Sequence, residues 1–412
     1  MKLPLPDVAR LFGLVLLAGC AAQPGASSVR LVGLASLPAA TFAAGPRSGK
    51  ALGPGPIHGA QLPLESQPVQ GVSGLFDAGD GRIGAVLDNG FGTRSNSADF
   101  LLRLVHLLPD FRTNQGGSGA IRFLDFIQLR DPFGHLPSSI VHEGTEERLL
   151  TGADLDPESI QQVSDGSFWV GDEFGPYLLH FHPNGTLLAP PIPLEDPSGP
   201  GRLQAAESSG SQPARVRPSG GFEGLALTPD GGRLLALLEK PLTGEAEDEL
   251  WLFEFHVGRE EYTGTYWRYP LEPEGTAIGD FQMVTDTRGY VLERDSKEGP
   301  DAQFKALFEI RLAGPRRRVE KRLLANLLAI PDPDGLSLGS PENQGASNLG
   351  QTGDFGLGDP YAMPFLTIEG LLVLDDGRVL IANDNNYPFS VGRHVGPGSP
   401  DDTEFVLLSW ED

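Results

Sequence analysis

Acidic residues recur along this chain at the two ends of a short repeated unit. Each unit runs from a polar or acidic residue through an apolar run to a turn containing Asp and Gly, and then through a second apolar run to another acid. The five units begin at Ser73, Glu158, Glu223, Asp280 and Glu369, and they close at Asp88, Asp172, Glu239, Glu293 and Asp384. Crowded carboxylates either bind a cation or acquire raised pKa values. Because Ca²⁺ takes six to eight oxygen ligands, calcium is the expected ion.

The same units supply the candidate site residues. The preferred metal ligands are Glu158, Asp172, Glu223, Glu369, Asp384 and Asn385. The second choices are Glu173, Glu239, Asp280 and Glu293.

The candidate catalytic residues are Glu173, Lys240 and Arg294. Lys240 and Arg294 directly follow closing acids and would bind a phosphate or carboxylate group of the substrate. The metal would activate a water molecule, with a nearby carboxylate as general base. The alternative is that these acids and cations form salt bridges that only stabilise the structure.

The turns indicate how these residues are positioned. Asp-Gly between apolar runs is a strong signal for a β-hairpin. In an antiparallel hairpin the start of the first strand lies beside the end of the second, so both polar ends of a unit meet away from the turn. Five such units at similar depth would place a ring of carboxylates on one face. A ring of hairpins in one chain predicts an all-β fold, a β-propeller.

The spacing of the units sets the expected number of blades. Successive units start 85, 65, 57 and 89 residues apart, so each interval holds one four-stranded blade and the two longest leave room for another. We expect one propeller domain over residues 29–412 with six blades, and five or seven remain open. Val29–Leu37 and Thr403–Trp410 are expected to pair and close the ring. A two-sheet sandwich is the alternative fold, and residues 319–330 are the best candidate for a helix.

The first twenty residues indicate an exported protein. An apolar run at residues 11–17 is shorter than the about 20 residues that span a bilayer, and it leads into Leu17-Ala18-Gly19-Cys20. This pattern resembles the lipobox of bacterial lipoproteins. Residues 1–19 would then be a signal peptide, Cys20 the lipidated N-terminus and residues 20–28 a flexible tether. We expect a lipid anchor in the cell envelope, at the outer membrane because Ala21 follows the cysteine; an ordinary secretory signal is the alternative.

The overall composition excludes several classes of function. Among 412 residues there are 55 acids and 31 Lys and Arg, which gives a net charge of −24. Binding to nucleic acid needs clustered positive charge, so no nucleic-acid partner is expected. A single Cys excludes both an intrachain disulfide and a cysteine-based zinc site. One G-x-S-x-G string occurs at residues 335–339, but it lies in a loop rich in Pro and Asp instead of the strand-turn-helix that a nucleophilic serine requires.

Several motifs together resemble the bacterial phytase-like family, also called the esterase-like activity of phytase family. They are GVSGL at 71–75, DPESI at 156–160, FWVGDEFGP at 168–176, GFEGL at 221–225, EKPL at 239–242, LERD at 292–295, IEGL at 368–371 and NDNN at 383–386. The resemblance implies a propeller and a hydrolase that acts on ester or phosphoester bonds of a small molecule. One departure is Leu87-Asp88-Asn89, where the family tends to carry Ser-Asp-Asp or similar.

Two functional hypotheses follow. The first is an extracytoplasmic lipoprotein hydrolase with Ca²⁺ in the propeller channel. The second is a non-catalytic propeller of the cell envelope that binds a ligand or a protein partner. Propellers host both kinds of function, so the fold does not decide between them.

Overall fold

The computed structural model describes residues 29–196, 202–203, 214–338 and 349–410. In these ranges the secondary structure is β-strand except for three short 3-10 helices, η1 (Lys50–Leu52), η2 (Val257–Arg259) and η3 (Gly299–Asp301). No helix in the described ranges is long and apolar enough to cross a membrane. The lipobox, Cys20 and the tether lie outside the described residues.

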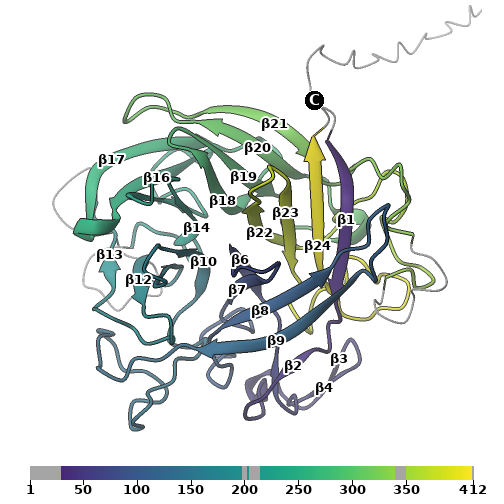
Figure 1. Cartoon of the computed structure of the whole chain (residues 1–412). Coiled ribbons are helices and arrows are strands. Elements are labelled where there is room, and N and C mark those ends of the chain that lie inside the picture. Colours follow the sequence, from purple (N-terminus) through teal and green to yellow (C-terminus); the bar gives the residue numbers. More distant parts are fainter. Residues whose placement is uncertain (1–28, 197–201, 204–213, 339–348, 411–412) are drawn as a thin grey trace, which may run out of the picture.

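The strands form five four-stranded blades around a central axis (Figure 1). Blade one contains β6 (Val72–Asp77), β7 (Ile83–Leu87), β8 (Arg103–Asp110) and β9 (Ala120–Gln128). Blade two contains β10 (Pro157–Gln162), β11 (Phe168–Asp172), β12 (Tyr177–Phe181) and β13 (Ile192–Pro193). Blade three contains β14 (Phe222–Leu227), β15 (Arg233–Leu238), β16 (Glu249–His256) and β17 (Glu261–Pro270). Blade four contains β18 (Ala277–Thr285), β19 (Arg288–Arg294), β20 (Lys305–Arg311) and β21 (Glu320–Asn326).

Blade five is assembled from both ends of the domain. It contains β22 (Thr367–Val373), β23 (Val379–Asp384), β24 (Thr403–Trp410) and, as its outer strand, β1 (Val29–Leu37). β1 pairs antiparallel with β24, with Leu34 opposite Val406, which confirms the expected closure. A single parallel bridge from Ser36 to Ala120 then joins blade five to blade one. Two small hairpin-like pairs lie between β1 and β6: β2 (Phe42–Ala43) with β5 (Gln67–Pro68), and β3 (Gly55–Ile57) with β4 (Ala60–Leu62).

The expected number of six blades is wrong, and the alternative of five describes the ring. The innermost strands β6, β10, β14, β18 and β22 each pack against the next, and β22 packs against β6, so five blades close the circle within the described residues. As far as the structure describes them, the two long intervals between units hold connections, residues 129–156, 327–338 and 349–366, instead of another sheet. Most of the predicted helix at 319–330 is β21, because its backbone pairs with β20 at the sheet edge.

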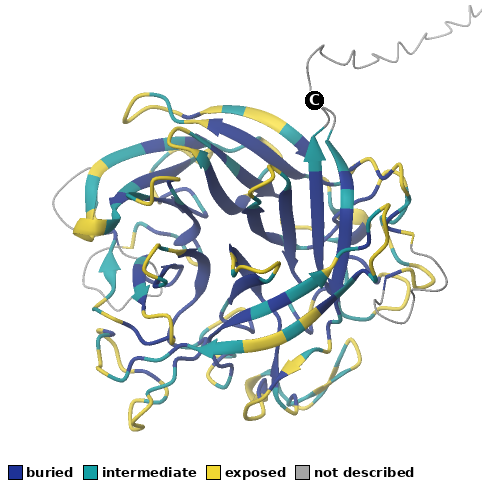
Figure 2. Ribbon diagram, viewed as in Figure 1, coloured by how far each residue is buried: buried dark blue, intermediate teal, exposed yellow. Residues whose placement is uncertain are grey.

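Packing between neighbouring blades forms the core. The inner strands are almost entirely buried and the outer strands are half exposed (Figure 2). Phe76 of blade one meets Phe168 of blade two with ring centroids 5.2 Å apart. Trp169 of blade two meets Phe255 of blade three at 5.0 Å. Aromatic side chains therefore fill the wedges between sheets.

The antiparallel order places the long connections on one face. Each inner strand begins at the face where the second strand ends, and the connections after the second and fourth strands return to that same face. This face therefore carries the long segments 38–71, 88–102, 129–156, 327–366 and 385–402, while short turns such as the one at Asp80 and Gly81 lie on the opposite face. Loops positioned by a rigid scaffold are the usual place for functional residues.

A candidate metal centre at the ring of inner strands

A β-bulge near the start of each inner strand determines which side chain faces the axis. The pairing register shifts between Val72 and Gly74, Pro157 and Ser159, Phe222 and Gly224, Ile278 and Asp280, and Ile368 and Gly370. The extra residues in these bulges are Ser73, Glu158, Glu223, Gly279 and Glu369. A bulge leaves one residue out of the ladder and re-aims its side chain. Three of the five blades therefore direct a glutamate toward the axis.

The second strand of each blade adds one more side chain at the same level. In each blade, the residue just before the bulge pairs with a residue of the second strand, and the residue directly after that partner lies at the level of the bulge. These residues are Asp88, Glu173, Glu239, Arg294 and Asp384. Backbone hydrogen bonds fix three of them, since the amides of Asp88, Glu173 and Glu239 donate to the carbonyls just before the inner strands at 2.9, 2.9 and 3.0 Å. We call the resulting set the acidic ring: Asp88, Asp156, Glu158, Glu173, Glu223, Glu239, Glu369 and Asp384 with the cations Lys240 and Arg294.

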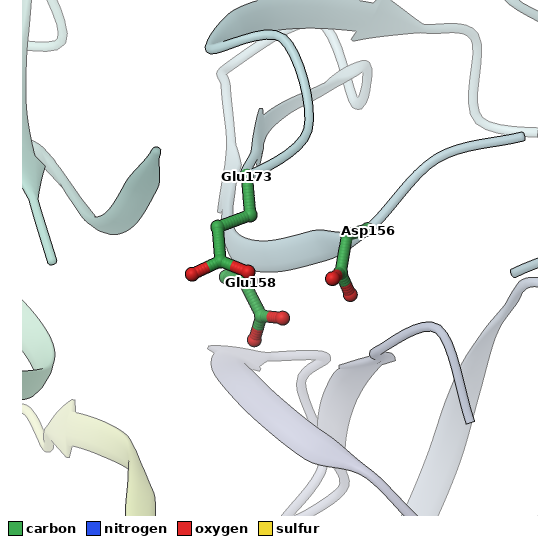
Figure 3. Close-up of side chains that lie close together, drawn as sticks. All are labelled: Asp156, Glu158 and Glu173. Atoms are coloured by element: carbon green, nitrogen blue, oxygen red, sulfur yellow. The ribbon is translucent and has the colours of Figure 1, made fainter. Parts of the chain in front are cut away.

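Glu173 lies at the centre of two groups of carboxylates within this ring. One oxygen from each of Asp156, Glu158 and Glu173 lies within 4.8 Å of the others (Figure 3). Glu173, Glu223 and Glu239 form a second group of the same dimension. All five residues are buried. A buried carboxylate without a counter-charge is costly, so each group needs a cation or protons.

Blade four supplies a cation instead of an acid. The Nη2 atom of Arg294 lies 3.0 Å from Glu369, 3.3 Å from Glu239 and 3.8 Å from Glu223, each time to the Oε1 atom. The bulge residue of this blade is Gly279, because a Cβ there would lie 1.9 Å from the carbonyl oxygen of Ile368. Arg294 therefore balances part of the charge of its three acidic neighbours.

Lys240 is the second cation of the ring. Its Nζ lies 2.8 Å from Glu239 Oε2, and it also donates to the carbonyls of Pro218 and Ser219. The side chain is one-third exposed, at 33%. It is therefore the charge in the ring that an anionic molecule arriving from solvent reaches most easily.

Burial and mutual repulsion make the acids of the ring hard to ionise. Burial raises the pKa of Glu158, Glu173 and Glu223 well above the ordinary value, and the neighbouring carboxylates add to the rise. Burial raises the pKa of Glu369 to about 8, although Arg294 acts in the opposite direction. Burial, with Asp88 nearby, raises the pKa of Asp384 to about 8 as well. In the absence of a metal the ring therefore holds protons at neutral pH.

The donor set fits a hard divalent cation. Eight carboxylates face two cations, and carboxylate oxygens are the preferred ligands of Ca²⁺. Within the described residues, Glu223 Oε1 and both polar side-chain atoms of the buried Asn385 have no hydrogen-bond partner. In blade one, Asn89, which follows Asp88 as Asn385 follows Asp384, donates to Asp156 at 2.7 Å. Asn385 finds no such carboxylate because Gly71 stands in blade one where Asp156 stands in blade two.

The structure brings together most of the predicted site residues. Among the predicted metal ligands, Glu158, Glu223, Glu369 and Asp384 lie in the acidic ring, as do the three predicted catalytic residues, Glu173, Lys240 and Arg294. Asn385 lies beside the ring, directly after Asp384.

Asp172 and two of the second choices face elsewhere. The Asp172 carboxylate accepts from the amides of Asp156 and Gly175 at 2.8 and 2.7 Å and lines a separate cavity. Asp280 accepts from the amide of Leu371 at 2.8 Å and so ties blade four to blade five. Glu293 accepts from Tyr269 at 2.6 Å and pairs with Lys321.

Two residues of the ring were missing from the predicted ligands. Asp156 directly precedes β10, and Asp88 directly follows β7. Asp88 is the closing acid of the first unit, as Asp384 is of the fifth, and applying the hairpin register of the second unit one residue further out would have found Asp156. Ser337 of the G-x-S-x-G string is buried, and its hydroxyl donates to Asp332 at 2.8 Å, which stabilises its loop.

Comparisons with known proteins place the chain in a family. The family model described as Phytase-like, esterase-like activity of phytase, matches residues 67–387, and the chain belongs to this family. The family description supports a hydrolase-type function with a small-molecule substrate. An uncharacterized secreted protein of Arthroderma benhamiae is 32% identical over 106 residues, which are 22% of this chain and 20% of that protein. The chain thus matches about a fifth of the length of this relative.

Solved structures give distant similarities. A thermostable family-43 glycoside hydrolase is 11% identical, with 84% of this chain and 94% of that chain covered and a TM-score of 0.41. A putative oxidoreductase (glucose dehydrogenase) from Thermus thermophilus is 14% identical, with 84% and 86% covered and a TM-score of 0.34. These similarities carry no argument about function.

Proposed function

We propose that this chain is a Ca²⁺-dependent hydrolase of ester or phosphoester bonds in small molecules, with the acidic ring as its active site. The observation that carries the proposal is the position of Glu173, which belongs to both groups of buried carboxylates and is acted on by the charge of Lys240. Arg294 pairs with Glu239 and Glu223 of the second group. Ion, base and cations thus meet at one place. We also propose that the protein is exported and held in the cell envelope by a lipid on Cys20.

Either of the two groups would hold the ion, with Glu173 as the ligand common to both. The groups are Asp156, Glu158 and Glu173, and Glu173, Glu223 and Glu239. A bound Ca²⁺ supplies positive charge that polarises the ester or phosphoester group. The site needs such a charge because Arg294 and Lys240 together neutralise only two of the eight carboxylates.

The chain's own residues account for the remaining roles. Lys240 is the more exposed cation and would orient an anionic group of the substrate through a charge-assisted hydrogen bond. Arg294 Nε has no hydrogen-bond partner within the described residues, so it offers one donor for negative charge that develops during the reaction. Glu173 is the carboxylate placed to accept a proton from the attacking water, because it belongs to both groups of carboxylates and therefore lies beside the ion in either one.

Calcium binding and hydrolysis can both be measured on the purified protein. Calorimetry with Ca²⁺ should show binding that Glu173→Gln weakens at least about tenfold, because this residue serves both groups. Asp376→Asn, on an exposed turn of the opposite face, is the matched control and should bind as the wild type does. Hydrolysis of phosphomonoesters and carboxylic esters should require Ca²⁺ and should be lost in Glu173→Gln.

Two other outcomes would change the conclusion. Ca²⁺ binding that Glu173→Gln leaves intact would show that the ion lies elsewhere. Binding that depends on Glu173, without hydrolysis of any ester in the panel, would refute the enzyme and support the non-catalytic propeller that binds a ligand or protein partner.

A further inference from the structure

A cavity of about 520 Å³ lies beside the acidic ring on the face of the long connections. Its walls come from the 88–102 and 129–156 connections and from the turn between β11 and β12. This volume lies in the range of sites for small organic ligands. We refer to it as the blade-two cavity.

One backbone segment separates the cavity from the ring. Asp172 and Phe174 line the cavity, while Glu173 between them points into the acidic ring. Neighbouring Cα atoms are about 3.8 Å apart, so a group in the cavity lies on the order of 10 Å from the carboxylates. The cavity and the ring thus share the backbone of residues 172–174, and a molecule in the cavity lies next to the proposed active site.

The acids in the cavity wall are committed to the fold. The two Asp172 oxygens accept from the amides of Asp156 and Gly175. Asp154 Oδ1 accepts from Val141 at 2.9 Å, and its Oδ2 accepts from the amide and hydroxyl of Thr151 at 2.8 Å each. All four oxygens thus have backbone or hydroxyl donors, so these acids hold the walls of the cavity in place.

The arginines in the wall have donors to spare. Arg94 donates from Nη1 to the carbonyl of Ala153 at 3.1 Å, whereas its buried Nε has no partner among the described residues. Its guanidinium stacks on the ring of Phe174, 4.0 Å from the centroid, which holds the charge in place before a ligand arrives. Arg202 also lines the cavity. Burial, with Asp172 nearby, raises the pKa of the Tyr177 hydroxyl, and Arg94 and Arg202 act in the opposite direction, so both positive charges lie near that side chain.

We propose that the blade-two cavity binds an oxyanion, a carboxylate or phosphate, carried by the part of the substrate that does not react. The substrate would then be an ester or phosphoester with a second, free anionic group, held by Arg94 and Arg202 and flanked by Phe174 and Tyr177. That the bound molecule is a substrate rests on the proposed function, whereas the binding of an anion by the cavity is independent of it.

Binding measurements on the full chain test the cavity without any need for turnover. Succinate and inorganic phosphate are the probes, and the more tightly bound of the two identifies the kind of oxyanion. Dimethyl succinate is the uncharged control. Arg94→Gln should weaken binding of the preferred anion at least about tenfold, since a hydrogen bond to a charged group contributes about that factor or more. Arg378→Gln, an exposed arginine on the opposite face, should leave binding unchanged.

Arg202→Gln provides a second variant, because Arg202 is exposed and its loss leaves the core intact. This variant should also weaken the binding of the preferred anion. Equal affinity of the wild type and both variants, or equal binding of dimethyl succinate, would overturn the proposal.

Kinetics separate the cavity from the proposed reaction. If the protein hydrolyses 4-nitrophenyl esters, Arg94→Gln should raise KM for the hemisuccinate ester by a larger factor than KM for the butyrate ester, which carries no free anionic group. Anion binding that depends on Arg94, without any hydrolysis, would refute the proposed function and support the proposal that the cavity binds an anion. If the wild type hydrolyses both esters and Arg94→Gln changes the KM of neither, the proposal that the cavity binds an anion is refuted and the proposed function stands.

Discussion

Without a divalent cation, this protein should become less stable as the pH rises through the mildly acidic range. Burial raises the pKa of Glu369 and of Asp384 to about 8, whereas such groups titrate near 4 in an unfolded chain. The folded protein therefore binds more protons than the unfolded chain between about pH 4 and about pH 8. With rising pH, the free energy of unfolding falls throughout the range in which the folded state holds more protons than the unfolded chain.

The size of the effect follows from the number of protons held. One proton held by the folded state alone changes the free energy of unfolding by about 1.4 kcal/mol per pH unit. From about pH 5 to about pH 6.5, each proton that Glu369 or Asp384 holds in the folded state alone thus corresponds to about 2 kcal/mol. His394 acts only above this window: burial lowers its pKa, but its hydrogen bond to Asp354 raises the pKa to about 10, so its proton separates the two states only above about 6.5.

The assay is urea denaturation in a chelator at several pH values, repeated with excess Ca²⁺. In the chelator the urea midpoint should fall with rising pH. With Ca²⁺ the trend should reverse, because the ion replaces the protons and binds the ionised ring more tightly. The double variant Glu369→Gln with Asp384→Asn should make the decline in the chelator shallower, because the other acids of the ring still hold protons, whereas Asp376→Asn should leave the slope unchanged. A midpoint in the chelator that stays constant or rises between pH 5 and 6.5 would refute the reasoning.

Three further perturbations probe the ring, the closure and the core. Arg294→Met should lower the free energy of unfolding in a chelator by about 3 kcal/mol, because it leaves Glu369 without its cation and removes one of the two cations that contact Glu239; a loss in the urea midpoint equivalent to less than about 1 kcal/mol would contradict this pairing. A chain that begins at Pro38 lacks β1 and exposes the edge of β24, so it should aggregate on size exclusion; a folded monomer would show that β1 is dispensable. Trp169→Ala should cost about 3–5 kcal/mol in urea denaturation, because the side chain is fully buried between blades two and three.

The hairpin units were predictable because their signals are local. At the first turn, Asp80 and Gly81 both have positive φ, 56° and 74°, the conformation that an Asp-Gly pair adopts readily in a tight hairpin. The apolar runs beside such turns become buried inner strands. Glu158, Glu223 and Glu369 could therefore be assigned to one end of the molecule from spacing alone.

Which of two adjacent residues faces the acidic ring could not be predicted in the same way. Asp172 and Glu173 are neighbours, yet only Glu173 belongs to the ring. Gly279 and Asp280 show the same one-residue difference in blade four. A shift of one residue reverses the face of a strand, and here each β-bulge introduces that shift. The position of a bulge depends on pairing with the second strand and on the neighbouring blade, so spacing along the chain did not reveal it.

The sequence by itself determined the all-β class, the repeated hairpins, the acidic character of one end and the family to which the chain belongs, because turn residues, strand periodicity and charge act over a few residues. Only the tertiary structure decided the number of blades, the partners of Arg294 and the membership of Asp156 in the ring. These depend on contacts between blades and on the pairing of Val29–Leu37 with Thr403–Trp410, residues that are more than 360 positions apart. Ring closure is a property of the whole chain, because each blade is positioned by its two neighbours.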